Sequence, residues 1–137
     1  MRNVSIQGGE MNSILLVEDE GHLRDLYRDE IEEAGFTVRS VSSGREAIDW
    51  IKKERPQLIV LDIMLPDISG LQVLQEIKTI DKTIPIIINS AFSVYKTDFL
   101  SWMADDYVVK SSSISELINT IKHHAQPLTG LPDLVTT

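Results

Sequence analysis

Leu58-Ile59-Val60-Leu61-Asp62 is the stretch that decides the fold. Four consecutive apolar residues indicate a strand that is buried on both faces, which is typical of a parallel sheet. The aspartate marks the point where this strand ends. Similar runs recur along the chain, and we predict strands over 14–17, 37–41, 58–61, 84–88 and 107–109, with the more mixed 37–41 at an edge.

Helical patterns separate these strands. Apolar residues recur at helical spacing over 23–34. Capping-box patterns begin at Ser43, Ser69 and Ser113, each with Glu or Gln three positions later. The segment 92–103 has aromatic residues at helical spacing but a poor start signal, so the bounds of its helix are ambiguous.

This alternation predicts an α/β protein. Five strand–helix pairs imply a parallel sheet that is covered by helices on both faces and connected by right-handed crossovers. At this length we expect a flavodoxin-like (βα)5 three-layer sandwich with a five-stranded parallel sheet in the order 2-1-3-4-5. The folded domain should span 12–125, after a disordered lead-in at 1–11 and before a flexible C-terminal tail at 126–137.

Composition restricts the function classes. The chain has 137 residues, 42% of them apolar, which suits one compact domain. A net charge of −8 and scattered Lys and Arg residues argue against direct DNA binding, which requires a concentrated basic surface. The absence of cysteine excludes disulfides and thiolate chemistry. With no apolar run of about 18 residues and no secretory signal, we expect no membrane span and a cytoplasmic location.

Polar residues follow four of the predicted strands. In an open parallel sheet, ligands bind beyond the carboxyl ends of the strands. Strands one, three and four are neighbours in the predicted order, with strand five beyond them, so the residues that follow them should converge. These residues are Glu18, Asp19 and Glu20 after the first strand, Asp62 after the third, Asn89 and Ser90 after the fourth, and Lys110 after the fifth.

The chemistry of this group points to phosphoryl transfer. Crowded carboxylates repel one another unless a cation bridges them, and Mg²⁺ accepts a few carboxylate ligands while keeping several waters. Glu18, Asp19 and Asp62 are therefore candidate ligands. Lys110 supplies a positive charge and Ser90 a hydroxyl donor, a set that can stabilise a phosphoryl group in transfer. Because aspartate forms acyl phosphates, we predict that Asp62 accepts the group.

Several segments resemble the response-regulator receiver domains of two-component signalling, the CheY-like proteins. Residues 14–20 resemble the first strand and acidic pair of that family, and residues 61–70 resemble its phosphoacceptor segment with its Pro and Gly. Ser90-Ala91 resembles the hydroxyl switch and the small residue after it. Residues 107–110 resemble the switch aromatic and the lysine. Five motifs in this order are specific, and the resemblance covers about 12–125.

The resemblance implies the metal ligands and the phosphoryl donor. Asp62 would be the phosphoacceptor. Asp19 would ligate Mg²⁺ directly and Glu18 mostly through water, and the main-chain carbonyl of Met64 would be a third protein ligand. The donor would be a sensor histidine kinase or a phosphotransfer protein. The protein would not be an enzyme, except that it catalyses its own phosphorylation and dephosphorylation.

The resemblance also implies a switch. Ser90 and Lys110 would bind phosphoryl oxygens, and Tyr107 would move between exposed and buried rotamers as Ser90 moves. The signal would pass through the fourth helix, fifth strand and fifth helix to a downstream protein or a fused output domain. The tail over 128–132 faintly resembles the opening of diguanylate cyclase domains, so the chain could be a fragment of a longer regulator.

The sequence departs from the family pattern after Lys110, before the last strand, and in its fourth helix, which is aromatic-rich where many relatives are Ala-rich. Ser111 replaces the usual proline after Lys110, and we predict a trans peptide there because a cis bond without proline costs about 3 kcal/mol. Met103-Ala104 replaces the family's Gly-Ala before the last strand. Met64 and Phe92 would flank the path of the attacking water, and since both are apolar we expect slow self-dephosphorylation.

Two other functions compete with this interpretation. A Mg²⁺-dependent phosphatase resembling the haloacid dehalogenases would need a second acid two residues after its nucleophile, where this chain has Met64. A receiver-like binding module that is never phosphorylated would not need Asp62, Lys110 or the acid pair, and all of them are present.

Overall fold

The computed structural model describes residues 13–110 and 113–126, apart from the side chains at 100 and 101. It contains five parallel strands in the order β2-β1-β3-β4-β5, which confirms the predicted topology. The strands are β1 (Ser13–Val17), β2 (Thr37–Val41), β3 (Leu58–Leu61), β4 (Ile86–Ser90) and β5 (Asp106–Val109). The helices are α2 (Gly21–Glu33), α3 (Gly44–Lys53), α4 (Gly70–Ile80), α5 (Lys96–Ser101) and α6 (Ile114–His124).

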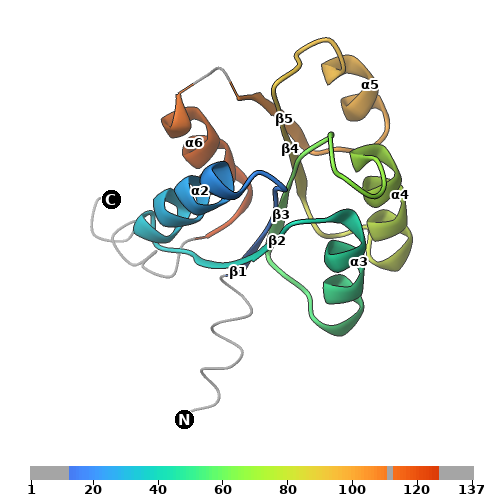
Figure 1. Cartoon of the computed structure of the whole chain (residues 1–137), viewed down its shortest axis with the longest axis horizontal. Helices are drawn as coiled ribbons and strands as arrows, with labels where there is room; N and C mark the ends of the chain where they lie inside the picture. The colour runs from blue at the N-terminus through green and yellow to red at the C-terminus, as the bar shows by residue number, and fades with distance from the viewer. Residues whose placement is uncertain (1–12, 111–112, 127–137) are drawn as a thin grey trace.

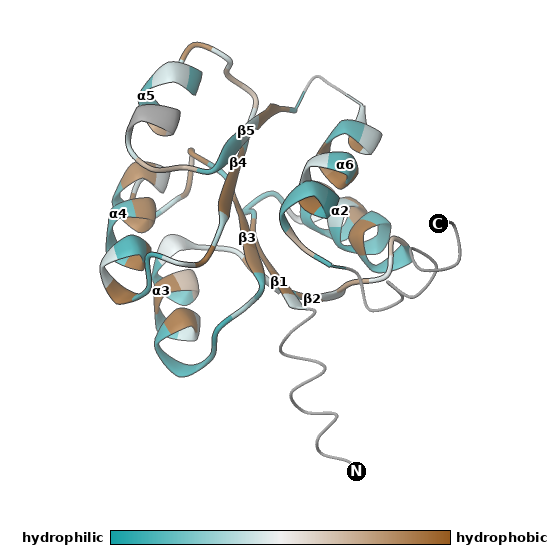
Figure 2. Ribbon diagram, turned by 180° about the vertical axis from the view of Figure 1, so that it is seen from behind, coloured by the Kyte–Doolittle hydropathy of each residue, from teal (hydrophilic) through white to brown (hydrophobic). Residues whose placement is uncertain are grey.

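Helices cover both faces of the sheet, as predicted. Figure 1 shows α3, α4 and α5 on one side and α2 with α6 on the other. Figure 2 shows that the strands between them are predominantly hydrophobic. Alternate strand residues divide between two buried clusters: Leu15 and Ile88 belong to the cluster under α3 and α4, and Leu16 and Ile87 to the one under α2 and α6. The apolar runs of β1 and β3 are continuous because every residue of these two strands is buried, whereas the edge strand β2 is partly exposed.

The register brings the carboxyl ends of four strands to one edge. Val17 pairs with Leu61, Leu61 pairs with Ile88, and Ser90 pairs with Val109. The residues after these positions therefore follow adjacent strands at nearly the same level. The polar residues predicted to converge are the ones that emerge at this edge.

Two of the three predicted capping boxes place a serine cap correctly. Ser43 Oγ accepts a hydrogen bond from Glu46 N at 3.2 Å, and Ser69 Oγ accepts one from Gln72 N at 3.2 Å. The side-chain cap at Ser113 is wrong: this residue is the N-cap, but its hydroxyl lies 2.8 Å from Ser115 Oγ and makes no cap bond.

The segment between β4 and β5 contains less helix than the sequence predicts. The predicted 92–103 helix is reduced to the six residues of α5. Met103 closes the turn that follows with a φ of 82°, a conformation that favours glycine. The start of β4 was also predicted too early, because Pro85 lies before the strand and its carbonyl accepts from Ile59 N at 2.9 Å.

The predicted lead-in and tail lie almost entirely outside the described residues. Residues 1–11 and all but the first residue of 126–137 lie outside the described residues, so the predicted lead-in and tail stay predictions. Among the described residues, no helix is both long and apolar enough to cross a membrane.

Candidate functional site

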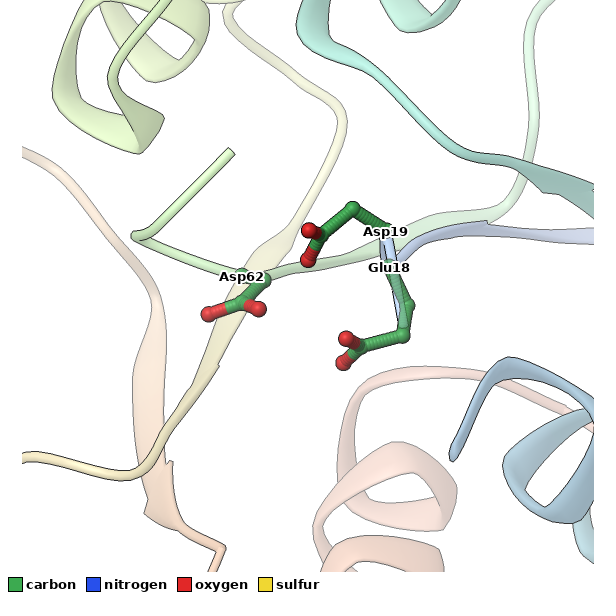
Figure 3. Close-up of side chains that lie close together, drawn as sticks. All are labelled: Glu18, Asp19 and Asp62. Atoms are coloured by element: carbon green, nitrogen blue, oxygen red, sulfur yellow. The ribbon is translucent and has the colours of Figure 1, made fainter. Parts of the chain in front are cut away.

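Three carboxylates meet at the edge where β1 and β3 end. Glu18 and Asp62 are buried, with 2% and 6% of their surfaces exposed, while Asp19 is exposed. Figure 3 shows the three side chains directed toward a shared space. One oxygen of each lies within 4.8 Å of the others. The sequence predicted this convergence, and the structure confirms the positions of all three acids.

Lys110 joins two of these acids from the end of β5. Its Nζ atom lies 2.8 Å from Glu18 Oε1 and 3.0 Å from Asp62 Oδ2. Burial alone would lower the pKa of Lys110, but the hydrogen bond to Glu18 and the charges of both acids outweigh it, so the pKa is raised. Lys110 is therefore a fixed cation at neutral pH.

The carboxyl group of Glu18 has a raised pKa. Burial raises its pKa, and the nearby charge of Asp62 adds to this rise, while Lys110 and the main-chain N–H of Glu20 oppose it. Glu18 Oε2 accepts that N–H at 3.1 Å. Asp62 Oδ1 accepts only the longer bond from Met64 N, at 3.3 Å. Each of these two carboxylates thus contacts Lys110 through one oxygen and a main-chain N–H through the other.

The loop after β1 is held by two residues whose roles the sequence did not predict. Arg24 Nη1 donates to the main-chain oxygen of Glu18 at 2.9 Å and to that of Asp19 at 3.3 Å. Glu20, which was predicted to join the site, instead caps α2 by accepting from Leu23 N at 2.8 Å. Both contacts fix the acid pair, and neither has a sequence signature beyond ordinary helix-start chemistry.

The loop after β3 is held by a glycine and an aspartate. Gly70 N donates to Ile63 O at 2.8 Å, and a Cβ atom at Gly70 would lie 2.6 Å from the main-chain oxygen of Asp62. The carboxylate of Asp67 accepts from the N–H groups of Gly44 and Arg45, at 3.0 and 2.8 Å. The first contact explains why this position needs glycine, and the second ties the loop to α3.

Ser90 and Tyr107 share the main chain of Phe92. Ser90 is fully buried, and its Oγ accepts from Phe92 N at 3.1 Å. The hydroxyl of Tyr107 donates to Phe92 O, and the side chain is 4% exposed. Burial raises the pKa of Tyr107, which keeps its hydroxyl protonated. The residue predicted as a switch thus occupies a buried position, bonded to the loop that follows Ser90.

The two apolar residues predicted to flank the phosphoacceptor are exposed. Met64 is 59% exposed and Phe92 is 46% exposed. The main-chain N–H of Met64, two residues after Asp62, donates a hydrogen bond to the Asp62 carboxylate at 3.3 Å. The prediction of a trans peptide between Lys110 and Ser111 lies outside the described residues, because Ser111 is not among them.

The donor set fits a hard divalent cation. Three carboxylate oxygens converge and the only cation in contact with them among the described side chains is Lys110, which neutralises one of their charges. Hard oxygen ligands with few protein contacts match Mg²⁺. Glu18, Asp19 and Asp62 are the side chains that could hold it.

Solved structures resemble this chain closely. Response regulator protein TrrA from Thermotoga maritima, solved in complex with Mg²⁺–BeF, is 40% identical, with a TM-score of 0.78 over 82% of this chain and 98% of that one. The same protein has been solved in complex with the histidine kinase ThkA. The receiver domain of a Luxo repressor protein from Vibrio parahaemolyticus is 32% identical, with a TM-score of 0.77 over 92% of this chain and 98% of that one.

Curated relatives point the same way. The polar-differentiation response regulator DivK of Brucella anthropi is 34% identical over 82% of this chain and 94% of its own length. The transcriptional regulatory protein HprR of Escherichia coli is 36% identical over 82% of this chain and 53% of its own length. The chain spans about half the length of several transcriptional regulators that it matches.

The family model of the response regulator receiver domain matches residues 14–122. This range includes Glu18, Asp19 and Asp62, and all five strands apart from the first residue of β1. The match agrees with the sheet order, with the convergence of Glu18, Asp19 and Asp62, and with the relatives above. The chain belongs to the response regulator receiver domains of two-component signalling systems.

Proposed function

We propose that Asp62 accepts a phosphoryl group in the presence of Mg²⁺. The observation that carries this proposal is the environment of the Asp62 carboxylate, which is buried, paired with Lys110 and grouped with two further acids. A carboxylate oxygen would attack phosphorus, forming an acyl phosphate as the N–P bond of a donor phosphohistidine breaks, and the leaving imidazole would take up a proton.

Glu18, Asp19, Asp62 and the main-chain carbonyl of Met64 would hold the metal. Mg²⁺, when bound, supplies positive charge against the phosphoryl oxygens. The use of this ion is supported by the donor set and by the TrrA structure with Mg²⁺–BeF. Lys110 would pair with a phosphoryl oxygen in place of one of its present carboxylate partners.

A switch would follow from the change at Asp62. The Ser90 hydroxyl would turn from the N–H of Phe92 to a phosphoryl oxygen, which would release the loop that Tyr107 now holds. We infer that this loop and the face formed by α5, β5 and α6 carry the signal. Each contact involved is a single hydrogen bond, so the new charge of the phosphoryl group can outweigh it.

The donor is proposed to be a histidine kinase or a phosphotransfer protein, supported by the complex of TrrA with ThkA. The acidic charge of −8 supports the expectation that this chain makes no direct contact with DNA. Several relatives are transcriptional regulators about twice as long as the matched segment, so we propose a fused output domain or a separate downstream protein as the target. A cytoplasmic location suits such partners.

Intact-mass spectrometry after incubation with acetyl phosphate and Mg²⁺ tests this function. We expect one added phosphoryl group in the wild type and in Asp49→Asn, an exposed aspartate of α3, but none in Asp62→Asn. An adduct that persists in Asp62→Asn would contradict the proposal. Catalytic consumption of many phosphodonors would indicate a phosphatase, and no reaction at all would indicate an unphosphorylated binding module.

A further inference from the structure

Asn89 is a buried amide that the proposed reaction does not use. It follows three isoleucines in β4, and only 3% of its surface is exposed. Its Nδ2 atom has no hydrogen-bond partner among the described residues. A buried donor without an acceptor costs free energy, and native proteins rarely leave one unpaired. We therefore expect Asn89 Nδ2 to donate a hydrogen bond to a group that the described residues do not include.

A small cavity lies against this amide. The centre of a water molecule can occupy about 20 Å³ of it, and about 10–15 Å³ of such volume is sufficient for one water. Its lining is partly polar, which favours water over an empty apolar void. The lining residues are Tyr27, Asn89, Lys110 and Ser113, with Val108, Val109, Ile114 and Leu117.

The cavity is next to the candidate site, and Lys110 belongs to both. Leu61 pairs with Ile88, so the next residues, Asp62 just after β3 and Asn89 within β4, lie at the same level of adjacent strands. Asn89 alternates with Ile88 and so shares the face of β4 on which Ile87 packs against residues of α2 and α6. Figure 1 shows these two helices on the same side of the sheet. Lys110 lines the cavity and extends from it to Asp62, 3.0 Å from its Nζ. The cavity therefore adjoins the lysine of the site.

We propose that this cavity binds one ordered water, that Asn89 Nδ2 donates a hydrogen bond to it, and that Asn89 thereby acts as a positioning residue for Lys110. Tyr27 and Ser113 also line the cavity, and a hydroxyl oxygen of this kind can accept one of the water's own protons. The bound water packs against Lys110, which lines the same cavity, and so restricts the conformations of its side chain. This keeps Nζ between Glu18 and Asp62.

The identity of the residue supports a role in function rather than in stability. A leucine, which branches at the same atom and is somewhat larger, would continue the run Ile86–Ile88 and would leave no unpaired donor. Replacing a buried polar group by an apolar one of the same shape is often neutral or stabilising. A polar residue kept at such a position is the pattern expected where stability is exchanged for activity.

Three variants test the proposal. Asn89→Leu removes the donor and fills the cavity, Asn89→Ser retains a polar group with room for water, and Ile87→Val is a control on the same face of β4. Each is compared with the wild type by crystallography at a resolution that shows waters, by urea unfolding, and by the rate of phosphorylation as a function of acetyl phosphate concentration.

We expect a water within hydrogen-bond distance of Nδ2 in the wild type. Asn89→Leu should lose the water, unfold at an equal or higher urea concentration, and show a maximum phosphorylation rate lower on the order of tenfold, with the half-saturating acetyl phosphate concentration unchanged. Asn89→Ser should keep most of the rate, and Ile87→Val should lose stability only. A purely structural role would move the unfolding midpoint and not the rate.

A dry cavity in the wild type, or wild-type phosphorylation kinetics in Asn89→Leu, would overturn the proposal. The role of Asn89 toward Lys110 rests on the proposed phosphorylation of Asp62. If the wild type accepted no phosphoryl group, the proposed function would fail, while the crystallographic water and the unfolding of Asn89→Leu would still decide what the cavity binds.

Discussion

Lys110 Nζ lies 3.0 Å from Asp62 Oδ2, although 48 residues separate them in the chain. The same atom also contacts Glu18, so one lysine compensates two buried carboxylates. Removing one partner of a buried ion pair leaves an uncompensated charge, which is more costly than the net stabilisation that the pair provides.

Lys110→Met should therefore destabilise the protein at neutral pH in the absence of Mg²⁺. We expect a loss of about 1–3 kcal/mol in the free energy of unfolding, below the range for fully buried pairs because solvent reaches this site. Added Mg²⁺ should restore stability more in the variant than in the wild type, since the ion replaces the missing charge. Urea unfolding with and without Mg²⁺ measures both effects. Equal stability of Lys110→Met and the exposed control Lys52→Met would contradict this account.

Gly70→Ala should disturb the loop that carries Asp62. The added Cβ would lie 2.6 Å from the main-chain oxygen of Asp62 and 2.7 Å from Ile63 Cα, and neither backbone atom can move cheaply. We expect a loss of about 1–3 kcal/mol in unfolding free energy together with slower phosphorylation. Gly21→Ala is the matched control, since its nearest contact would be an ordinary 3.8 Å to Arg24. A Gly70→Ala variant as stable as Gly21→Ala would show that the loop is not tightly packed.

The fold was predictable because its signals are local. Continuous apolar runs such as Leu58–Leu61 and the serine caps of α3 and α4 act within a few residues. The acids and Lys110 could be placed once the strand order was assumed. What the sequence could not show depends on distant partners: Asp67 binds the start of α3, 22 and 23 residues away.

The surroundings of individual polar side chains also could not be predicted from the sequence. Asn89 and Ser90 are neighbours in β4, yet Asn89 lines a small cavity with residues of α2, β5 and α6 that are distant in the sequence. Ser113 matches a capping box but its hydroxyl turns to Ser115. Both cases depend on side-chain orientation, which periodicity and residue type do not specify.

Met103→Gly should stabilise the protein. Met103 has a φ of 82°, which costs a residue with a Cβ atom roughly 1–2 kcal/mol relative to glycine. Because the side chain is 56% exposed, little packing is lost on its removal. We expect a gain of about 1 kcal/mol in unfolding free energy, measured in urea. Met103→Ala keeps the strain and should show no such gain; equal gains in both variants would mean that the side chain, not the backbone, is responsible.

Polar residues at positions 64 and 92 should shorten the lifetime of the phosphorylated form. Met64 and Phe92 are exposed and apolar, so neither can orient a water toward the phosphoryl group. The double variant Met64→Glu with Phe92→Gln should hydrolyse faster by about tenfold or more, since a positioned base accelerates proton transfer. Loss of the phosphorylated species, followed by intact mass after removal of acetyl phosphate, gives the rate. Val94→Gln, exposed nearby, is the control, and an unchanged double variant would refute the expectation of a slow intrinsic reaction.

Borohydride reduction of the phosphorylated protein tests the central claim most directly, because it converts an aspartyl phosphate to homoserine at the modified position. After treatment with acetyl phosphate and Mg²⁺, peptide sequencing by mass spectrometry should find homoserine at position 62 and at no other aspartate. Omission of Mg²⁺ should greatly reduce the yield. Homoserine at Asp19 or elsewhere, or its complete absence from position 62, would contradict the assignment of Asp62 as the phosphoacceptor.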